Sequence, residues 1–129
     1  MPHSLPVLIV DDMEICRIAT ALILREAGFS SQQAGSGHEA LAKLKSGSLS
    51  AVIMDFHMPD MTGAQCAEII RSGERSTGAH LPIIGLTSNY SPEVEKLCLA
   101  AGMNIVLEKS SHASGLLAAL SAVMQTKAV

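Results

Sequence analysis

Residues 51–63 read AVIMDFHMPDMTG, in which a short apolar run ends in Asp55 and a turn-forming segment follows. An apolar run of this length predicts a buried β-strand, and Pro59 and Gly63 predict that a turn comes after it. A carboxylate at the end of a buried strand is unfavourable unless it has partners. The position of Asp55 therefore indicates a functional site.

Three other apolar runs also end in polar residues. They are residues 5–10 before Asp11 and Asp12, residues 82–86 before Thr87, and residues 105–107 before Glu108 and Lys109. If the four runs are parallel strands of one sheet, their polar ends meet at one edge. Open α/β sheets bind ligands at that edge, so we expect carboxylates, a hydroxyl and an ammonium to share a crevice there.

The apolar runs alternate about five times with segments of helical period, which predicts an α/β fold with a parallel sheet. We expect a doubly wound, five-stranded sheet in the order 2-1-3-4-5, a flavodoxin-like (βα)5 fold, with the polar residues 29–34 as an edge strand. This order places Asp11 and Asp12 beside Asp55. The whole chain, residues 1–129, is expected to form a single domain.

The first helix is expected to follow residues 5–10 closely. Asp12 is a candidate N-cap, and Gly28 stands where a left-handed C-cap would end the helix. One apolar face is formed by Ile15, Ile18, Ala19, Leu22 and Ile23. Helical periodicity therefore predicts a helix with one apolar face.

Composition excludes several classes of protein. The net charge is -3 and the nine Lys and Arg residues are scattered, so no basic surface is expected to bind nucleic acid. The three cysteines form no CxxC pair, which favours reduced thiols over a disulfide framework or a zinc site. The longest apolar stretch, residues 116–124, is too short to span a bilayer, and the N-terminus does not resemble a signal peptide. We expect a cytoplasmic protein without membrane contact.

The polar strand ends suggest a specific chemistry. Neighbouring carboxylates such as Asp11, Asp12 and Asp55 repel one another unless a cation compensates them. Hard oxygen ligands favour Mg²⁺, which commonly binds one or two carboxylates together with phosphate oxygens. Lys109 and Thr87 could hydrogen-bond to a phosphoryl group, and attack by Asp55 on phosphorus would form an acyl phosphate. Each residue alone has an ordinary structural interpretation, but their joint placement favours a shared site.

Over nearly the whole chain, these residues resemble the receiver domain of two-component response regulators. The matching motifs, in order, are Asp11-Asp12, Asp55 with Met58-Pro59 and Gly63, Thr87, Ala101-Gly102-Met103-Asn104, and Lys109. The resemblance implies that Asp55 is the phosphoacceptor. It also implies that Asp12, Asp55 and the backbone carbonyl of His57 bind Mg²⁺, with Asp11 acting largely through a coordinated water.

The resemblance also implies roles for the other polar residues of the crevice. Lys109 would contact the phosphoryl group, and Thr87 would move toward it on activation. His57 and Asn89 hold positions that flank the approach of hydrolytic water in receiver domains. They would therefore influence the lifetime of the phosphoryl group.

Two residues depart from the receiver pattern. Ser110 follows Lys109 where receivers usually carry a proline, often with a cis bond. A non-proline cis bond costs about 3 kcal/mol, so a trans bond is expected here. Val106 stands where many receivers carry the Tyr or Phe that moves inward with the threonine. An aromatic switch is therefore absent at this position.

The leading hypothesis is a receiver domain that takes a phosphoryl group from a histidine kinase or a histidine phosphotransfer protein. It would signal through contacts with a downstream protein, with only self-catalysed phosphoryl transfer and slow self-dephosphorylation, so it is not expected to be an enzyme. Receivers often pair through the fourth helix, fifth strand and fifth helix, which makes a dimer through that face compatible with the resemblance.

Three alternatives remain open from the sequence. The chain could be a receiver module of a longer hybrid histidine kinase, or a degenerate receiver that acts as a binding module. A haloacid dehalogenase-like phosphatase would also use an aspartyl nucleophile and Mg²⁺. Those enzymes need a second aspartate two residues after the nucleophile as acid and base, where this chain has His57.

Overall fold

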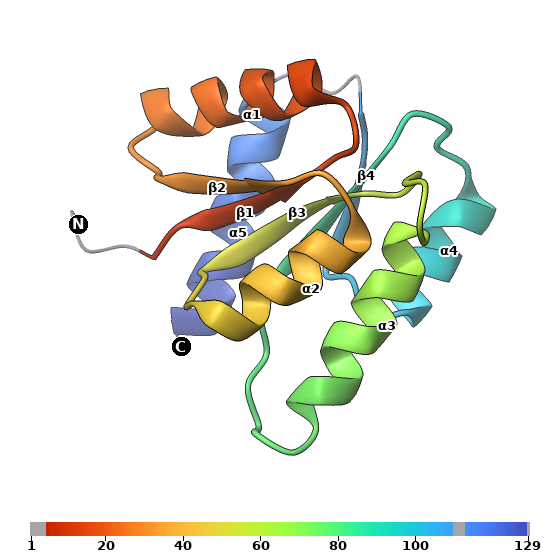
Figure 1. The fold of residues 1–129 in the computed structure, drawn as a ribbon. Helices are drawn as coiled ribbons and strands as arrows, with labels where there is room; N and C mark the ends of the chain where they lie inside the picture. The colour runs from red at the N-terminus through yellow and green to blue at the C-terminus, as the bar shows by residue number, and fades with distance from the viewer. Residues whose placement is uncertain (1–4, 110–112, 129) are drawn as a thin grey trace.

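The computed structural model describes residues 5–109 and 113–128, with side chains as far as residue 124. Within these residues, five strands alternate with five helices (Figure 1). The strands are β1 Val7–Val10, β2 Ser31–Ala34, β3 Ala51–Asp55, β4 Ile83–Thr87 and β5 Ile105–Glu108. The helices are α1 Glu14–Glu26, α2 Gly37–Ser46, α3 Gly63–Glu74, α4 Pro92–Ala100 and α5 Ala113–Ala128.

The strands form one parallel sheet in the order β2-β1-β3-β4-β5, which confirms the predicted fold. Val10 pairs with Met54, and Asp55 pairs with Leu86. This register brings the carboxyl ends of β1, β3 and β4 to one edge of the sheet. None of the described helices is long and apolar enough to cross a membrane.

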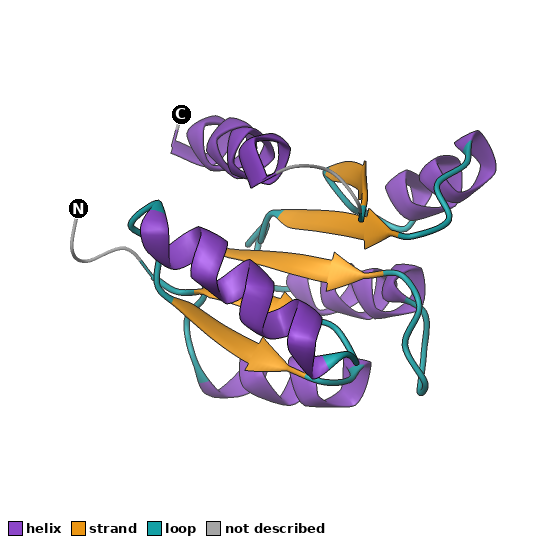
Figure 2. Cartoon of the chain, turned by 90° about the horizontal axis from the view of Figure 1, so that it is seen from above, coloured by secondary structure: helices purple, strands orange, loops and turns teal. Residues whose placement is uncertain are grey.

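Helices cover both faces of the sheet (Figure 2). Val7, Ile9 and Ile53 pack with Leu24 of α1 and Leu120 of α5 on one face. The alternate residues of the same strands pack against α2, α3 and α4 on the other face. Because β1 and β3 are buried on both faces, they read as continuous apolar runs.

Helix α1 starts differently from the prediction. Its N-cap is Met13, which makes no side-chain cap, and the Asp11 carboxylate accepts a hydrogen bond from the Met13 N–H at 2.9 Å. The N-cap prediction for Asp12 was therefore wrong. The predicted end was right, because Gly28 has a φ of +94° directly after the C-cap Ala27.

Most of the predicted apolar face of α1 is exposed. Ile15, Ile18 and Leu22 are 73%, 46% and 53% exposed, whereas Leu24 is fully buried. The helix packs on the sheet through a face that includes Ala21 and Leu24, and the apolar stripe of Ile15, Ile18 and Leu22 faces outward. Periodicity identified the stripe correctly but could not say what it contacts.

Strand β5 contains Val106, one of the two departures from the receiver pattern. Val106 is buried and pairs with Gly85 of β4, where the Met103 side chain occupies the space that a Cβ on Gly85 would need. The thioether of Met103 therefore fills this part of the core. The other departure, Ser110, and the trans bond expected between Lys109 and Ser110 lie outside the described residues.

Candidate functional site

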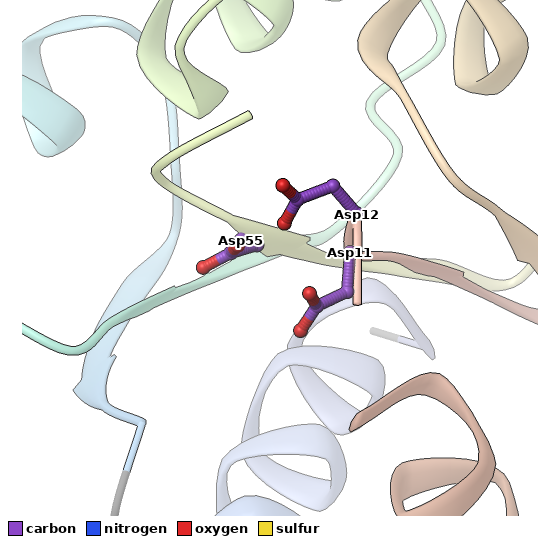
Figure 3. A group of neighbouring side chains, drawn as sticks. All are labelled: Asp11, Asp12 and Asp55. Carbon is purple, nitrogen blue, oxygen red and sulfur yellow. The ribbon is translucent and has the colours of Figure 1, made fainter. Parts of the chain in front are cut away.

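Three carboxylates gather at the ends of β1 and β3, as the sequence predicted (Figure 3). Asp11, Asp12 and Asp55 each offer an oxygen, and these oxygens all lie within 4.8 Å of one another. Asp11 and Asp55 are only 4% exposed, whereas Asp12 is open to solvent. The cluster therefore concentrates negative charge, and solvent reaches it at Asp12.

Lys109 supplies the compensating charge from the end of β5. Its ammonium nitrogen lies 2.8 Å from an Asp11 oxygen and 3.4 Å from an Asp55 oxygen. The backbone N–H of Lys109 donates to the Thr87 carbonyl at 2.7 Å, which ties this position to the end of β4. Sheet register thus holds the cation over the carboxylates.

The charged groups of this cluster shift one another's pKa values. Burial and the Asp11 charge raise the pKa of Asp55, the Lys109 charge opposes them, and the net result is a pKa of about 6. For Lys109, burial acts to lower the pKa. A hydrogen bond to Asp11 and the charges of Asp55 and Asp11 outweigh that effect, so the pKa of Lys109 is raised. Lys109 is therefore protonated and Asp55 can still ionise near neutral pH.

Thr87 lies at the end of β4 and is fully buried. Its hydroxyl oxygen accepts a hydrogen bond from the Asn89 N–H at 3.1 Å. The Asn89 side chain is exposed on the loop between β4 and α4, and His57 is exposed on the loop after β3. The His57 ring packs edge-on against Phe56, with 4.9 Å between the ring centroids.

Gly63 explains why α3 can begin so close to Asp55. Its N–H donates to the Phe56 carbonyl at 2.7 Å, and a Cβ at this position would lie 2.5 Å from the Asp55 carbonyl oxygen. Glycine is required here by space and not by a positive φ. The sequence identified Gly63 as part of a motif, but only the structure gives this reason.

The family model for the response regulator receiver domain matches residues 7–121. The chain belongs to the response regulator receiver family. Receiver domains are signalling domains, and the five-stranded order of this chain is theirs.

Curated relatives of this receiver domain are much longer proteins. It is 34% identical over 115 residues to the CAI-1 autoinducer sensor kinase/phosphatase CqsS of Vibrio cholerae serotype O1, covering 89% of this chain and 17% of that protein. It is 35% identical over 103 residues to the sensor histidine kinase RcsC of Escherichia coli K12, covering 80% of this chain and 10% of that protein. The chain thus spans less than a fifth of the length of these relatives.

Solved structures of receiver proteins superpose over nearly the whole chain. The chemotaxis protein CheY4 of Vibrio cholerae is 32% identical, with a TM-score of 0.85 over 93% of this chain and 98% of that one. The co-crystal structure of the Saccharomyces cerevisiae histidine phosphotransfer protein Ypd1 with the receiver domain of Ssk1 gives 28% identity. Its TM-score is 0.90, over 98% of this chain and 92% of that one.

The acidic cluster of this receiver domain suits a divalent cation. Receiver domains generally bind Mg²⁺ at an acidic pocket, and the three carboxylate oxygens here are hard ligands that are close enough to share one ion. Within the part of the chain that the structure describes, no group hydrogen-bonds to the Asp12 carboxylate. Asp12 is thus the carboxylate that is freest to accept a ligand.

Sequence reasoning missed a set of contacts that Asp60 makes beside the site of this receiver domain. The Asp60 carboxylate, on the loop after β3, accepts hydrogen bonds from the N–H groups of Gly37 and His38 at 3.1 and 2.8 Å, and it pairs with the His38 ring. The hydrogen bond from the His38 N–H is the main reason that the pKa of Asp60 falls to about 2. These contacts join the loop after Asp55 to the start of α2, and no short motif indicates them.

Proposed function

We propose that this chain is a phosphoacceptor receiver domain of a two-component phosphorelay, with residues 1–129 forming one domain. The observation that supports it best is the buried Asp55 carboxylate beside Lys109 and two further carboxylates. A buried nucleophile, a cation and a set of oxygen ligands are the components that aspartyl phosphate formation requires.

The proposed reaction transfers a phosphoryl group from a phosphohistidine to Asp55. A carboxylate oxygen of Asp55 forms a bond to phosphorus while the phosphorus–nitrogen bond breaks, and its electron pair returns to the imidazole. Asp55 must be ionised to react, and its pKa of about 6 leaves it mostly ionised at neutral pH. Lys109, 3.4 Å from Asp55, turns its ammonium to a phosphoryl oxygen as charge builds up there.

Mg²⁺ would be held by Asp12, Asp55 and the backbone carbonyl of His57, with Asp11 acting largely through a coordinated water. Bound Mg²⁺ supplies positive charge that offsets the carboxylates and the incoming phosphoryl oxygens. Asp11 is less suited to direct ligation, because its carboxylate already accepts the Met13 N–H and pairs with Lys109.

Thr87 would carry the signal away from the site. Movement of its hydroxyl toward a phosphoryl oxygen breaks the hydrogen bond from the Asn89 N–H and releases the start of the loop before α4. Val106 provides no aromatic ring to follow this movement. The exposed side chains of His57 and Asn89 lie on loops that border the site, where they would influence the access of hydrolytic water.

The phosphoryl donor would dock on the outward face of α1. Ile15, Ile18 and Leu22 form an exposed apolar stripe that begins three residues after Asp12, beside the crevice. Exposed apolar patches of this kind mark interaction sites. A histidine kinase or a histidine phosphotransfer protein on this face would bring its phosphohistidine close to Asp55 in the cytoplasm.

A receiver module of a hybrid histidine kinase is the second candidate. It is favoured by the length of the curated relatives, of which this chain covers 17% and 10% in the two cases above. Chemistry at Asp55 is the same in both cases. The two differ in whether the phosphoryl group arrives from a kinase in the same protein.

The deciding experiment incubates the protein with Mg²⁺ and acetyl phosphate and measures intact mass. The wild type should gain one covalent phosphoryl group, and Asp55→Asn should gain none. Glu108→Gln is a matched control, because it removes an exposed carboxylate at the end of β5, which β4 separates from β3. No adduct on the wild type would favour a degenerate receiver that acts as a binding module, and an adduct that persists in Asp55→Asn would refute the role of Asp55.

A further inference from the structure

An arginine outside the acidic crevice makes a hydrogen bond to the backbone of a crevice residue. Arg17, in the second turn of α1, donates from Nη1 to the backbone carbonyl of Asp11 at 2.7 Å. Its Nε donates to the side-chain oxygen of Gln33 in β2 at 3.3 Å. The guanidinium therefore links the turn after β1 to the edge strand of the sheet.

The Asp11 carbonyl belongs to the peptide unit that joins Asp11 to Asp12. The orientation of this peptide plane sets the directions in which both side chains leave the backbone. Asp11 is also held by the Met13 N–H and Lys109, but the Asp12 carboxylate accepts no hydrogen bond from the described residues. The direction of Asp12 therefore depends on its backbone, and that backbone is held by Arg17.

Glycine at position 35 leaves space for the guanidinium. A Cβ on Gly35, in the turn after β2, would lie 3.2 Å from Nη1 of Arg17. The two hydrogen-bond acceptors define the position of the group in this space. A planar guanidinium is suited to such a site, whereas a lysine ammonium cannot reproduce both bonds with the same geometry.

We propose that Arg17 is a positioning residue for Mg²⁺ binding, which holds the Asp11–Asp12 peptide so that Asp12 faces the ion. The inference rests on the proposed function, because it assumes that Asp12 is a Mg²⁺ ligand. A positive charge near a cation site is unfavourable by Coulomb's law, so the charge of Arg17 alone would weaken Mg²⁺ binding. Positioning and charge therefore predict opposite effects when Arg17 is removed.

The test measures the Mg²⁺ dissociation constant by isothermal titration calorimetry at constant ionic strength. Arg17→Met should weaken binding about tenfold, as loss of groups that orient metal ligands typically does. Arg17→Lys keeps the charge but should also weaken binding. The matched control is Arg25→Met, which removes an exposed arginine from the last turn of the same helix and should leave the affinity unchanged.

Equal or tighter Mg²⁺ binding by Arg17→Met would overturn this inference and leave the proposed function intact. Failure of the wild type to bind Mg²⁺ would overturn both. If Arg17→Met does not fold, Gln33→Met removes one acceptor of Arg17 and should weaken Mg²⁺ binding in the same direction. An unchanged affinity in Gln33→Met would then count against the positioning role. In the metal-free protein, a shifted Asp12 amide resonance in both variants gives an independent readout.

Discussion

Lys109 makes its shorter ion pair with Asp11, at 2.8 Å, while its distance to Asp55, the proposed nucleophile, is 3.4 Å. The ammonium therefore compensates two buried carboxylates at once. Without Mg²⁺, Lys109 is the cation that the described residues place against both of them.

Lys109→Met should destabilise the Mg²⁺-free protein by about 2 kcal/mol, because it leaves two buried carboxylates without a cation. Added Mg²⁺ should restore more stability in this variant than in the wild type. Urea denaturation with and without Mg²⁺ measures both quantities. Lys96→Met, an exposed lysine on α4, is the matched control, and an equal loss of stability in the two variants would contradict the expectation.

The stability of the Mg²⁺-free protein should depend on the ionisation of Asp55. Its pKa is about 6 in the folded protein and 3.8 as an ordinary carboxyl, so between these pH values the folded state holds a proton that the unfolded state releases. Lowering the pH from 7 toward 4 should therefore stabilise the fold through this group. Thermal unfolding in a chelator should show a flatter pH dependence for Asp55→Asn, and parallel curves would argue against the raised pKa.

Gly63→Ala should destabilise the protein by about 2 kcal/mol or more, because the new Cβ would lie 2.5 Å from the Asp55 carbonyl oxygen. The backbone shift that relieves this contact moves Asp55, so labelling by acetyl phosphate should also slow. Gly73→Ala is a control in the same helix, with no atom within 4 Å of the added Cβ. It should be neutral or more stable by about 0.5 kcal/mol, since alanine favours helix. Chemical denaturation of the two variants gives the comparison.

Ile15→Ser should slow phosphoryl transfer from a histidine phosphotransfer protein while leaving labelling by acetyl phosphate unchanged. The side chain is 73% exposed, so its loss should not affect folding. Leu97→Ser on α4 removes a side chain that is 53% exposed and should affect neither reaction. Transfer rates measured at increasing donor concentration should show that the donor binds Ile15→Ser more weakly than the wild type. Equal rates for the two variants would mean that the donor docks elsewhere.

Thr87→Val should separate phosphorylation from the response to it. The variant keeps the volume of the side chain but removes the acceptor of the Asn89 N–H. Acetyl phosphate should still label Asp55, but the amide resonances of residues 88–91 should change less on labelling than in the wild type. A full response in Thr87→Val would mean that the signal leaves the site by another route.

Sequence periodicity predicted most of the fold because the strands are covered on both faces. The buried runs of β1 and β3 read as continuous apolar segments, and parallel pairing then brings Asp11 and Asp55 together. The clustering of the carboxylates and Lys109 follows from this topology, and the structure confirms it.

Features that depend on packing were not predictable in the same way. The stripe that includes Ile15 is apolar, but whether an apolar face meets the sheet or a partner depends on tertiary structure. The hydrogen bond from Arg17 to the Asp11 carbonyl joins a side chain to a backbone group, and no residue pattern indicates such a contact. The N-cap of α1, Met13, was missed because Asp11 uses its carboxylate in the turn before the helix.

If the phosphoryl donor docks on the outward stripe of α1, as proposed, the same stripe would limit how many proteins this receiver can bind at one time. The stripe borders one crevice, so a protein that delivers a phosphoryl group to Asp55 and a protein that removes it would compete for the same surface. Only one of the two proteins could then be bound at a time. The relative concentrations of the competing proteins, and not only their intrinsic rates, would set the direction of phosphoryl flow.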